Sequence, residues 1–472
     1  MNLRPYLWPA SLVALGLVLR LTVLFAGPWG HVVRAVQHDS TRYIYLADSI
    51  RKHGSFGLEK EEPIPAWEGL FNLRKSNGTL PPPDEHGLYP EVLRTPGYPL
   101  CIATFEAITG DLRAILFVQC VLGALSAAAV RKLGLNLGLS SRAAFAAGLL
   151  WAVHPGLIVR DCVFMTESLF NALSLFSIFF ASTGRGWKSW LSAGALLGFD
   201  GLVRPVALAF LPAVLFLVFR SSKRRVVATG LTLIVALLPP FGWAVRNAAV
   251  GNGFRVSTVG EVTIYYYFLA SVRAEERGED PYATWQKQAD QLLKELQAKV
   301  KPGEDVSAVM QREAVEELKS KPNVTAKVLL KSQVRLWAAH SVGDLYDLFG
   351  EKYQSTNLVA RYVFGEKADG PSPSPVDVLL PAAWSGLNVL LIVAMLVGTV
   401  RALRNHEWGL VVPLAITIAL FSAATMSQGM ERFRTPFLFA VVLLAGRSLG
   451  SAKPGEKAPI SEPFRRIFFR PR

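Results

Sequence analysis

Apolar runs of roughly 16 to 25 residues, close to the length at which a helix crosses a bilayer, recur along this chain between short basic loops. Such runs restrict the fold strongly, because every backbone N–H and C=O group inside a bilayer must form its hydrogen bond within the protein. Only 18% of the 472 residues are charged, whereas soluble proteins carry about a quarter. The sequence therefore predicts an all-α polytopic membrane protein.

About ten crossings are expected from the length rule. The first run, Tyr6 to Ala26, has no small-residue cleavage site behind it and is predicted to be a retained helix. The apolar stretch at 96–109 is too short to span easily, so we expect it to be re-entrant or to lie in the interface. The expected spans are residues 7–26, 113–130, 143–160, 162–181, 189–203, 205–220, 226–244, 378–400, 408–425 and 435–449.

Basic loops give the chain an orientation. The connections "RKLGLNLGLSSR", "TGRGWKS", "RSSKRR" and "RALRNHEW" fall on one side of the expected bundle, and the positive-inside rule makes that side cytoplasmic. The formal net charge of +14 is then largely an orientation signal with added attraction to anionic lipids. Because the basic residues are scattered over separate loops, a nucleic-acid-binding surface is disfavoured.

Four parts follow from this orientation. Residues 1–244 form an N-terminal transmembrane module, whose first outer loop, 27–112, is expected to be catalytic. Residues 245–376 form an outer, periplasmic segment with three amphipathic helices separated by Pro and Gly. Residues 377–450 are the C-terminal transmembrane helices, and 451–472 are a basic cytoplasmic tail.

Ionisable residues gather on the outer side, where short loops should be poor in arginine. Near membrane depth such groups cost a few kcal/mol each, so they point to function. Arginines converging with carboxylates suggest an anionic ligand that arrives from the lipid, and a prenyl-linked phosphate fits, because arginine donates bidentately to phosphate oxygens. The residues concerned are Asp39, Arg94, Glu167, Arg204, Arg246, Arg432 and Arg434.

Each of these residues also has a structural interpretation. Asp39, Arg42, Tyr43 and Leu46 share one face of a predicted helix, and Asp39 is equally suited to be its N-cap. Arginines at the ends of spans often extend to the headgroups as anchors. Glu167 is placed either to pair with Arg160 or to stabilise a helix N-terminus.

Seven sequence pieces occur in an order that resembles the GT-C superfamily of membrane glycosyltransferases. The resemblance is to the bacterial branch related to protein O-mannosyltransferases and the lipid A aminoarabinose transferase, and it covers most of residues 1–260 and about 380–450. The pieces are "HDSTRYIYLADSI", "RTPGYPL", "FVQCVLGALSAAAVRKLG", "AVHPGLIVRDCVFMTESLF", "GLVRPVALAFLPA", "LLPPFGWAVRNAAVGNGFRVST" and "ERFRTPFLFAVVLLAG".

The resemblance implies an inverting transferase in the bacterial inner membrane. It would take a sugar from a polyprenyl-phosphate donor and transfer it, on the outer face, to an envelope lipid, glycan or protein. Asp39 matches the first-loop carboxylate that acts as general base or orients the acceptor, and Glu167 matches an acidic position after the second outer turn. Arg42 matches a basic residue near the donor phosphate. Arg94, Arg204 and Arg434 match recurrent basic positions, with Tyr43, Arg246 and Arg432 as secondary candidates.

The chain also departs from the family patterns. Residue 40 is Ser, so the Asp–Glu pair typical of protein O-mannosyltransferases is absent, and no "WWD" triplet of the oligosaccharyltransferases occurs. Both departures put a protein acceptor in doubt.

Two assignments of the chemistry stay open. In one, Asp39 serves the acceptor and Arg94, Arg204 or Arg434 bind the phosphate; in the other, Arg42 takes the phosphate and Glu167 assists the acceptor. A divalent metal held by Asp39 and Glu167 is a further option.

Three other classes of function also remain open. A lipid-linked sugar flippase would favour polar residues at mid-membrane, where these spans are apolar. A non-catalytic protein of envelope polysaccharide assembly would not need Asp39 and Glu167. The third is a polysaccharide polymerase or ligase with a pyrophosphate-linked donor.

Overall fold

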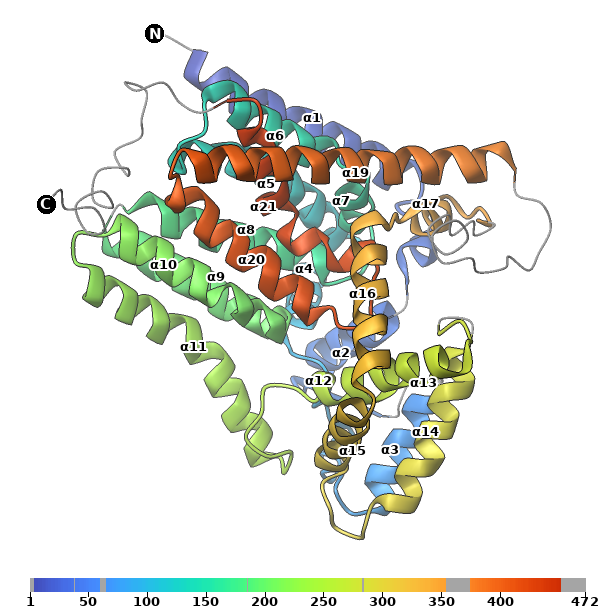
Figure 1. Ribbon diagram of the computed structural model, residues 1–472. Coiled ribbons are helices and arrows are strands. Elements are labelled where there is room, and N and C mark those ends of the chain that lie inside the picture. The colour runs from blue at the N-terminus through green and yellow to red at the C-terminus, as the bar shows by residue number, and fades with distance from the viewer. Residues whose placement is uncertain are drawn as a thin grey trace, which may run out of the picture.

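The computed structural model describes residues 4–37, 39–59, 65–184, 186–281, 284–353 and 374–450. Nearly all of these residues lie in helices or in the turns between them. A bundle of long helices forms one part of the molecule, and shorter helices cover one end of it (Figure 1). The predicted basic tail, 451–472, lies outside the described residues, as does 354–373 of the predicted outer segment.

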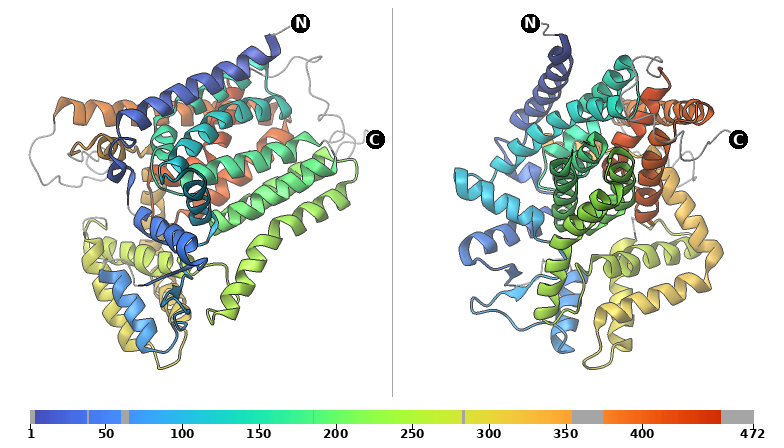
Figure 2. Two further views of the ribbon diagram at one scale, coloured as in Figure 1. Left: turned by 180° about the vertical axis from the view of Figure 1, so that it is seen from behind. Right: turned by 90° about the vertical axis from the view of Figure 1, so that its left-hand side faces the viewer.

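The bundle is built from N-terminal and C-terminal helices together. In its interior α8 packs between α5 and α9, α9 packs against α11, and α19 packs against α21 (Figure 2). The helices are α1 (Arg4–Ala26), α5 (Ala114–Asn136), α6 (Ser141–Val153), α7 (Pro155–Asp161), α8 (Glu167–Thr183), α9 (Trp187–Val203), η2 (Pro205–Phe210), α10 (Leu211–Ser221), α11 (Arg225–Ala249), α19 (Pro375–Arg404), α20 (Trp408–Ala424), η4 (Glu431–Phe433), η5 (Thr435–Phe437) and α21 (Leu438–Arg447).

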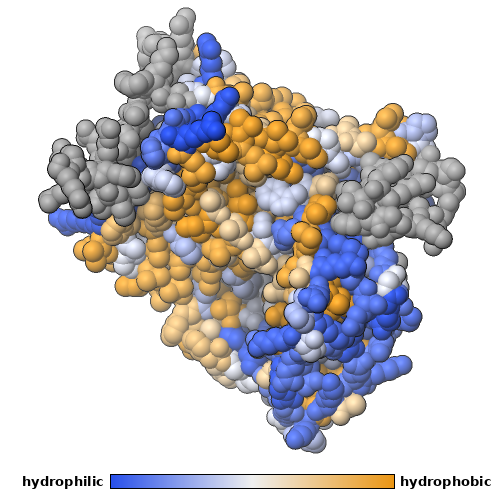
Figure 3. Space-filling model, viewed as in Figure 1, coloured by the Kyte–Doolittle hydropathy of each residue, from blue (hydrophilic) through white to orange (hydrophobic). Residues whose placement is uncertain are grey.

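The outer surface of the bundle is apolar. Large side chains such as Ile234 and Leu238 on α11, and Leu390 and Leu396 on α19, are 56–69% exposed, and apolar residues cover this part of Figure 3. Exposed apolar area costs about 25 cal/mol per Å² in water, so this surface suits lipid. The protein is an all-α, multi-pass membrane protein, as predicted.

Length and composition support fewer spans than the ten expected. Among the described residues, four helices are long and apolar enough to cross a membrane: Leu7–Ala26, Ala114–Asn136, Arg225–Ala249 and Pro375–Arg404. The pair α6 and α7 makes a fifth if it is counted as one bent span. The count of ten crossings therefore stays a prediction.

The span expected at 143–160 is broken. Helices α6 and α7 meet at an angle of 51°, and His154 between them has an extended backbone with φ −65° and ψ 118°. Pro155 has no N–H to donate and disfavours helical geometry in the residue before it. The next helix, α8, begins at Glu167 rather than at residue 162.

The first loop folds into four short helices and a two-stranded sheet. They are η1 (Val32–Ala35), α2 (Ser40–His53), β1 (Gly57–Leu58), α3 (Pro65–Ser76), β2 (Tyr89–Pro90) and α4 (Gly97–Thr109). The strands are antiparallel, with Gly57 opposite Pro90 and Leu58 opposite Tyr89. Helix α4, the short apolar helix expected at 96–109, packs against α2, α5 and α9.

The segment between α11 and α19 contains the three expected amphipathic helices as α14 (Trp285–Lys299), α15 (Val306–Ser320) and α16 (Pro322–Ala338). It also contains α12 (Val259–Val262), η3 (Thr263–Leu269), α13 (Ala270–Arg277) and α17 (Val342–Phe349). Its surface is hydrophilic in Figure 3. Leu70 and Leu73 of α3 share a core with Leu292 and Leu296 of α14, so the first loop and this segment pack as one layer.

Candidate active site

Charged side chains meet where the bundle joins this layer. Asp39 immediately precedes α2, Glu167 is the first residue of α8, Arg204 directly follows α9, and Arg432 lies in η4. The loops from α10 to α11 and from α19 to α20 lie at the opposite end of the bundle (Figure 1). These residues therefore occupy the end away from the basic loops.

Asp39 is turned toward an arginine rather than toward its own helix. It occupies the N-cap position of α2, but its side chain makes no capping hydrogen bond. Its Oδ1 accepts a hydrogen bond from Arg94 Nη2 at 2.7 Å. The Arg94 guanidinium also lies 5.7 Å from the centre of the Tyr43 ring. The interpretation of Asp39 as a simple cap therefore finds no support in the geometry.

Tyr43 is close to both ion pairs of this region. It is buried on the same face of α2 as Arg42 and Leu46, which confirms the predicted helical face. Its hydroxyl is within electrostatic range of Arg94 and Asp39, and also of Arg204 and Glu167. Burial is the main cause that raises the pKa of this hydroxyl, so Tyr43 stays a neutral hydrogen-bonding group at neutral pH.

Glu167 and Arg204 form the second ion pair. Arg204 Nη1 lies 2.9 Å from Glu167 Oε1, and the Glu167 side chain is 1% exposed. Neither carboxylate oxygen has a hydrogen-bond partner among the described residues. The Arg204 guanidinium also lies over the rings of Phe170 and Phe433, at 5.6 and 5.8 Å. A buried carboxylate of this kind must be stabilised by charge around it.

Arg160 and Arg432 supply that charge, since both act electrostatically on Glu167 together with Arg204. Arg160 is 1% exposed and is paired with Asp344 of α17. Arg432 Nε and Nη1 are buried and have no hydrogen-bond partner in the described part of the chain. We call Asp39, Tyr43, Arg94, Arg160, Glu167, Arg204, Asp344 and Arg432 the ion-pair cluster.

A close helix contact brings the two ion pairs together. Thr95 Oγ1 donates a hydrogen bond to the Val203 carbonyl at 3.2 Å. Gly97, the first residue of α4, packs so tightly that a Cβ there would lie 2.7 Å from the Leu202 carbonyl carbon. Glycine allows this approach, and Arg94 and Arg204 are held on adjacent chain segments as a result.

Comparisons with known proteins agree with this architecture. Residues 93–243 match the sequence model of the dolichyl-phosphate-mannose-protein mannosyltransferase family. An oligosaccharyltransferase of Archaeoglobus fulgidus, tethered with an acceptor peptide, aligns with a TM-score of 0.52 at 13% identity, over 95% of this chain and 50% of that one. The chain has the GT-C fold.

This chain spans about half of that archaeal structure, since 50% of it is covered. ArnT from Cupriavidus metallidurans, bound to undecaprenyl phosphate, aligns with a TM-score of 0.38 at 14% identity, over 94% of this chain and 78% of that one. No curated protein sequence matches the chain.

Within this GT-C fold, three of the predicted arginines lie outside the ion-pair cluster. Arg42 donates from Nε and Nη2 to Glu91 Oε2, at 2.8 and 2.5 Å. Arg246 donates to the carbonyls of Glu91 and Phe56. Arg434 pairs with Glu431 at 2.8 Å and donates to three carbonyls, those of Leu336, Trp337 and Ala339. These three guanidinium groups therefore join separate segments of the chain.

Sequence reasoning missed several members of the site. Glu91 was not singled out, yet its Oε1 accepts from the backbone N–H groups of Leu93 and Arg94, at 2.5 and 2.8 Å. It thereby fixes the backbone that carries Arg94. Its position three residues before Arg94 was the available signal. Asp344 offered none, because its contact with Arg160 joins residues far apart in the chain.

The cluster is a poor site for a divalent metal. Among the described residues, no group of three His, Cys, Asp or Glu is placed to hold one. Asp39 and Glu167 each lie within 2.9 Å of an arginine nitrogen, and guanidinium groups repel a metal cation. The two carboxylates therefore do not fit the metal site considered from the sequence.

Proposed function

We propose that the protein is an inverting glycosyltransferase of the bacterial inner membrane. It moves a sugar from a polyprenyl-phosphate donor to an envelope lipid, glycan or protein acceptor on the outer face. The observation that carries this proposal is the ion-pair cluster. In it, buried Arg432 nitrogens beside Glu167 have no hydrogen-bond partner among the described residues, and the Asp39 side chain makes no hydrogen bond that caps its helix. The matched family model, whose description names a dolichyl-phosphate donor, supports the choice of donor.

The chemistry is a single displacement. The acceptor hydroxyl oxygen attacks the anomeric carbon and loses its proton to Asp39, while the bond from that carbon to the phosphate oxygen breaks. The electron pair leaves with the phosphate. A positioned base contributes about 10²–10⁴-fold, and guanidinium groups aimed at the leaving oxygen stabilise the charge that develops there.

The contacts of Arg42 favour one of the two assignments left open by the sequence. Arg42 is occupied by Glu91, which supports Asp39 on the acceptor side and Arg204 with Arg432 on the phosphate side. Arg94 orients the Asp39 carboxylate through its hydrogen bond. Glu167 holds Arg160, Arg204 and Arg432 in position around the leaving group.

The basic loops indicate which side of the membrane the site faces. The cluster lies at the end of the bundle away from the basic loops, and the positive-inside rule makes those loops cytoplasmic. The sugar would therefore be transferred on the outer face, where the donor presents its headgroup after crossing the membrane.

The test uses purified protein in nanodiscs and a panel of radiolabelled undecaprenyl-phosphate sugars. Release of undecaprenyl phosphate, together with transfer of label to an envelope lipid extract, is the expected result for at least one donor. Protein-dependent movement of donor across a sealed vesicle, without release of undecaprenyl phosphate from any donor, would contradict the proposal and indicate a transporter.

A further inference from the structure

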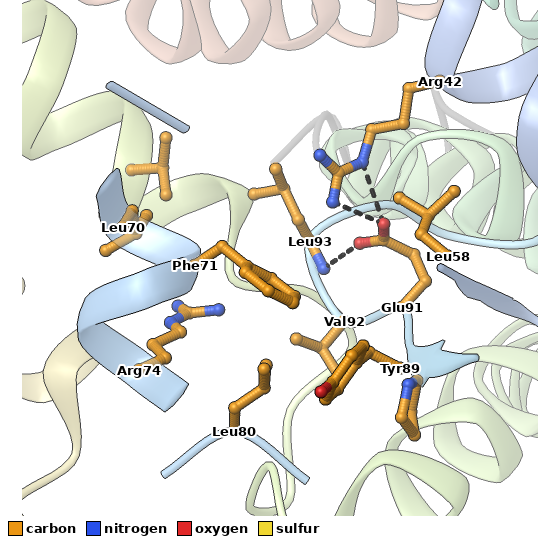
Figure 4. A pocket seen from close by; sticks show the side chains of 12 residues that line it. Arg42, Leu58, Leu70, Phe71, Arg74, Leu80, Tyr89, Glu91, Val92 and Leu93 are labelled. Carbon is orange, nitrogen blue, oxygen red and sulfur yellow. Dashed lines mark hydrogen bonds and ion pairs between the residues drawn. The ribbon is translucent and has the colours of Figure 1, made fainter. Parts of the chain in front are cut away.

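A pocket lies between the first loop and the outer segment. It has about 520 Å³ of empty space, a volume that includes open solvent at its mouth. Strand β2, helix α3 and Val262 form its walls (Figure 4). Most of the lining is apolar or aromatic, with Phe71 and Tyr89 in edge-to-face contact at 5.1 Å.

Arg74 gives this pocket a positive group. Its side chain is half-buried on α3 and reaches the pocket beside Phe71 in Figure 4. Nη2 donates to Ser307 Oγ at 2.6 Å, but no carboxylate of the described chain lies within ion-pair distance of Arg74. A guanidinium in an apolar pocket without a carboxylate partner is suited to bind an anion brought by a ligand.

Arg42, the other arginine of the lining, is already neutralised by Glu91. Among the residues that line the pocket, Arg74 is therefore the arginine without a carboxylate in direct contact. Asp305, Glu91 and Glu261 act on it from beyond ion-pair distance, and an anion held in the pocket would pair with it directly.

The pocket adjoins the proposed site of chemistry. Leu93 lines the pocket, and the next residue, Arg94, holds Asp39; adjacent Cα atoms lie about 3.8 Å apart. Glu91 links the pocket to the proposed site of chemistry. It accepts a hydrogen bond from the Arg42 side chain at the pocket wall and another from the backbone N–H of Arg94. The wall of the pocket is therefore continuous along the chain with the segment that positions Asp39.

We propose that this pocket binds the acceptor, and that the acceptor carries a phosphate or carboxylate group beside an apolar or aromatic portion. Arg74 takes the anionic group, the rings of Phe71 and Tyr89 take the apolar portion, and the hydroxyl that attacks the sugar lies beyond Leu93. This inference rests on the proposed transferase function for its assignment to the acceptor, while the binding chemistry of the pocket rests on its own lining.

Binding is measured first, with full-length protein in phosphatidylcholine nanodiscs and saturating undecaprenyl phosphate to occupy the proposed donor site. Phenyl phosphate or benzoate should bind at least tenfold more tightly than benzyl alcohol or inorganic phosphate, and the preferred one identifies the anion. Arg74→Gln should weaken that binding at least tenfold. Arg312→Gln, at an exposed arginine paired with Glu304, should not change it.

Leu80→Trp provides a second variant that fills the pocket and leaves Arg74 in place. It should also weaken binding at least tenfold. Binding equal to wild type in both Arg74→Gln and Leu80→Trp would overturn the proposal, as would equal affinity for benzyl alcohol and phenyl phosphate.

The acceptor role has its own readout. The tighter-binding anion should inhibit transfer of sugar to the lipid extract but not slow hydrolysis of the donor by water, and Arg74→Gln should be resistant to this inhibition. Binding that depends on Arg74 without inhibition of transfer would overturn the acceptor assignment. Absence of any donor turnover in wild type would instead be a failure of the transferase proposal itself.

Discussion

Glu167 Oε1 and Arg204 Nη1 lie 2.9 Å apart where the Glu167 side chain is 1% exposed. Removing two charges from water costs several kcal/mol per ion, and the attraction within a single ion pair offsets this cost only when additional partners contribute. Arg160 and Arg432 are the additional charges that act on Glu167. The carboxylate thus interacts electrostatically with three guanidinium groups, and several of their buried N–H groups have no hydrogen-bond partner among the described residues.

Glu167→Gln should therefore destabilise the protein by about 3–5 kcal/mol, because it leaves buried guanidinium groups without their carboxylate. Thermal unfolding in nanodiscs measures this. The matched control is Glu106→Gln on α4, where the nearest arginine atom, Arg51 Nε, is 3.8 Å away; that change should stay within about 0.5 kcal/mol. Equal unfolding midpoints for the two variants would contradict this stabilising role.

Arg432→Gln and Arg434→Gln should differ in their effect on donor binding. Arg432 has buried nitrogens without hydrogen-bond partners in the described part of the chain, so its loss should raise the KM for the donor about 10- to 100-fold, the worth of a hydrogen bond to a charged group. Its loss should also lower the unfolding midpoint, because Arg432 is one of the charges that stabilise the buried Glu167 carboxylate. Arg434 is paired with Glu431, so its loss should lower the midpoint and leave the KM for the donor unchanged. A raised KM in Arg434→Gln with an unchanged KM in Arg432→Gln would move the phosphate contact to Arg434.

Stability should depend on Glu91 in a defined pH window. Burial raises the pKa of Glu91, but Arg42 and the backbone N–H groups of Arg94 and Leu93 outweigh it, so the pKa is held below 4.5. A depressed folded-state pKa contributes stability that is present above the unfolded value and lost as pH falls through the folded one.

The difference in unfolding midpoint between wild type and Glu91→Gln should thus be large at pH 7 and shrink as pH falls below 4.5. Glu316→Gln, at an exposed position on α15, should show a small difference that does not vary over the same range. A pH-independent effect of Glu91→Gln would mean that its charge does not stabilise the fold.

The local pattern of residues was sufficient to predict the helices, but it could not predict which residues pair with their charged side chains. Spacing placed Arg42 and Tyr43 on one helical face, and that face is buried. The same spacing could not reveal that Glu91, which follows strand β2 in another part of the loop, would pair with Arg42. Likewise, the recurring basic positions pointed to Arg434, while the long-range packing of η4 leaves Arg432 with the unpaired nitrogens.

The helix break at Pro155 was also not predicted from hydropathy. Hydropathy over 143–160 is continuous, and only the backbone chemistry of proline interrupts it. The break brings Arg160 at the end of α7 to the start of α8, next to Glu167. A window that averages hydrophobicity cannot register this, although the short spacing in the sequence had already suggested Arg160 as a partner of Glu167.

The central claim is that Asp39 is the base for the acceptor, and Asp39→Asn tests it most directly. Asp48→Asn, at a half-exposed carboxylate on the same helix α2, is the matched control. Transfer of sugar by Asp39→Asn should fall by about 10²–10⁴-fold, with donor binding retained and Asp48→Asn as active as wild type. Wild-type turnover in Asp39→Asn would contradict the account and leave Asp39 as a partner of Arg94 only.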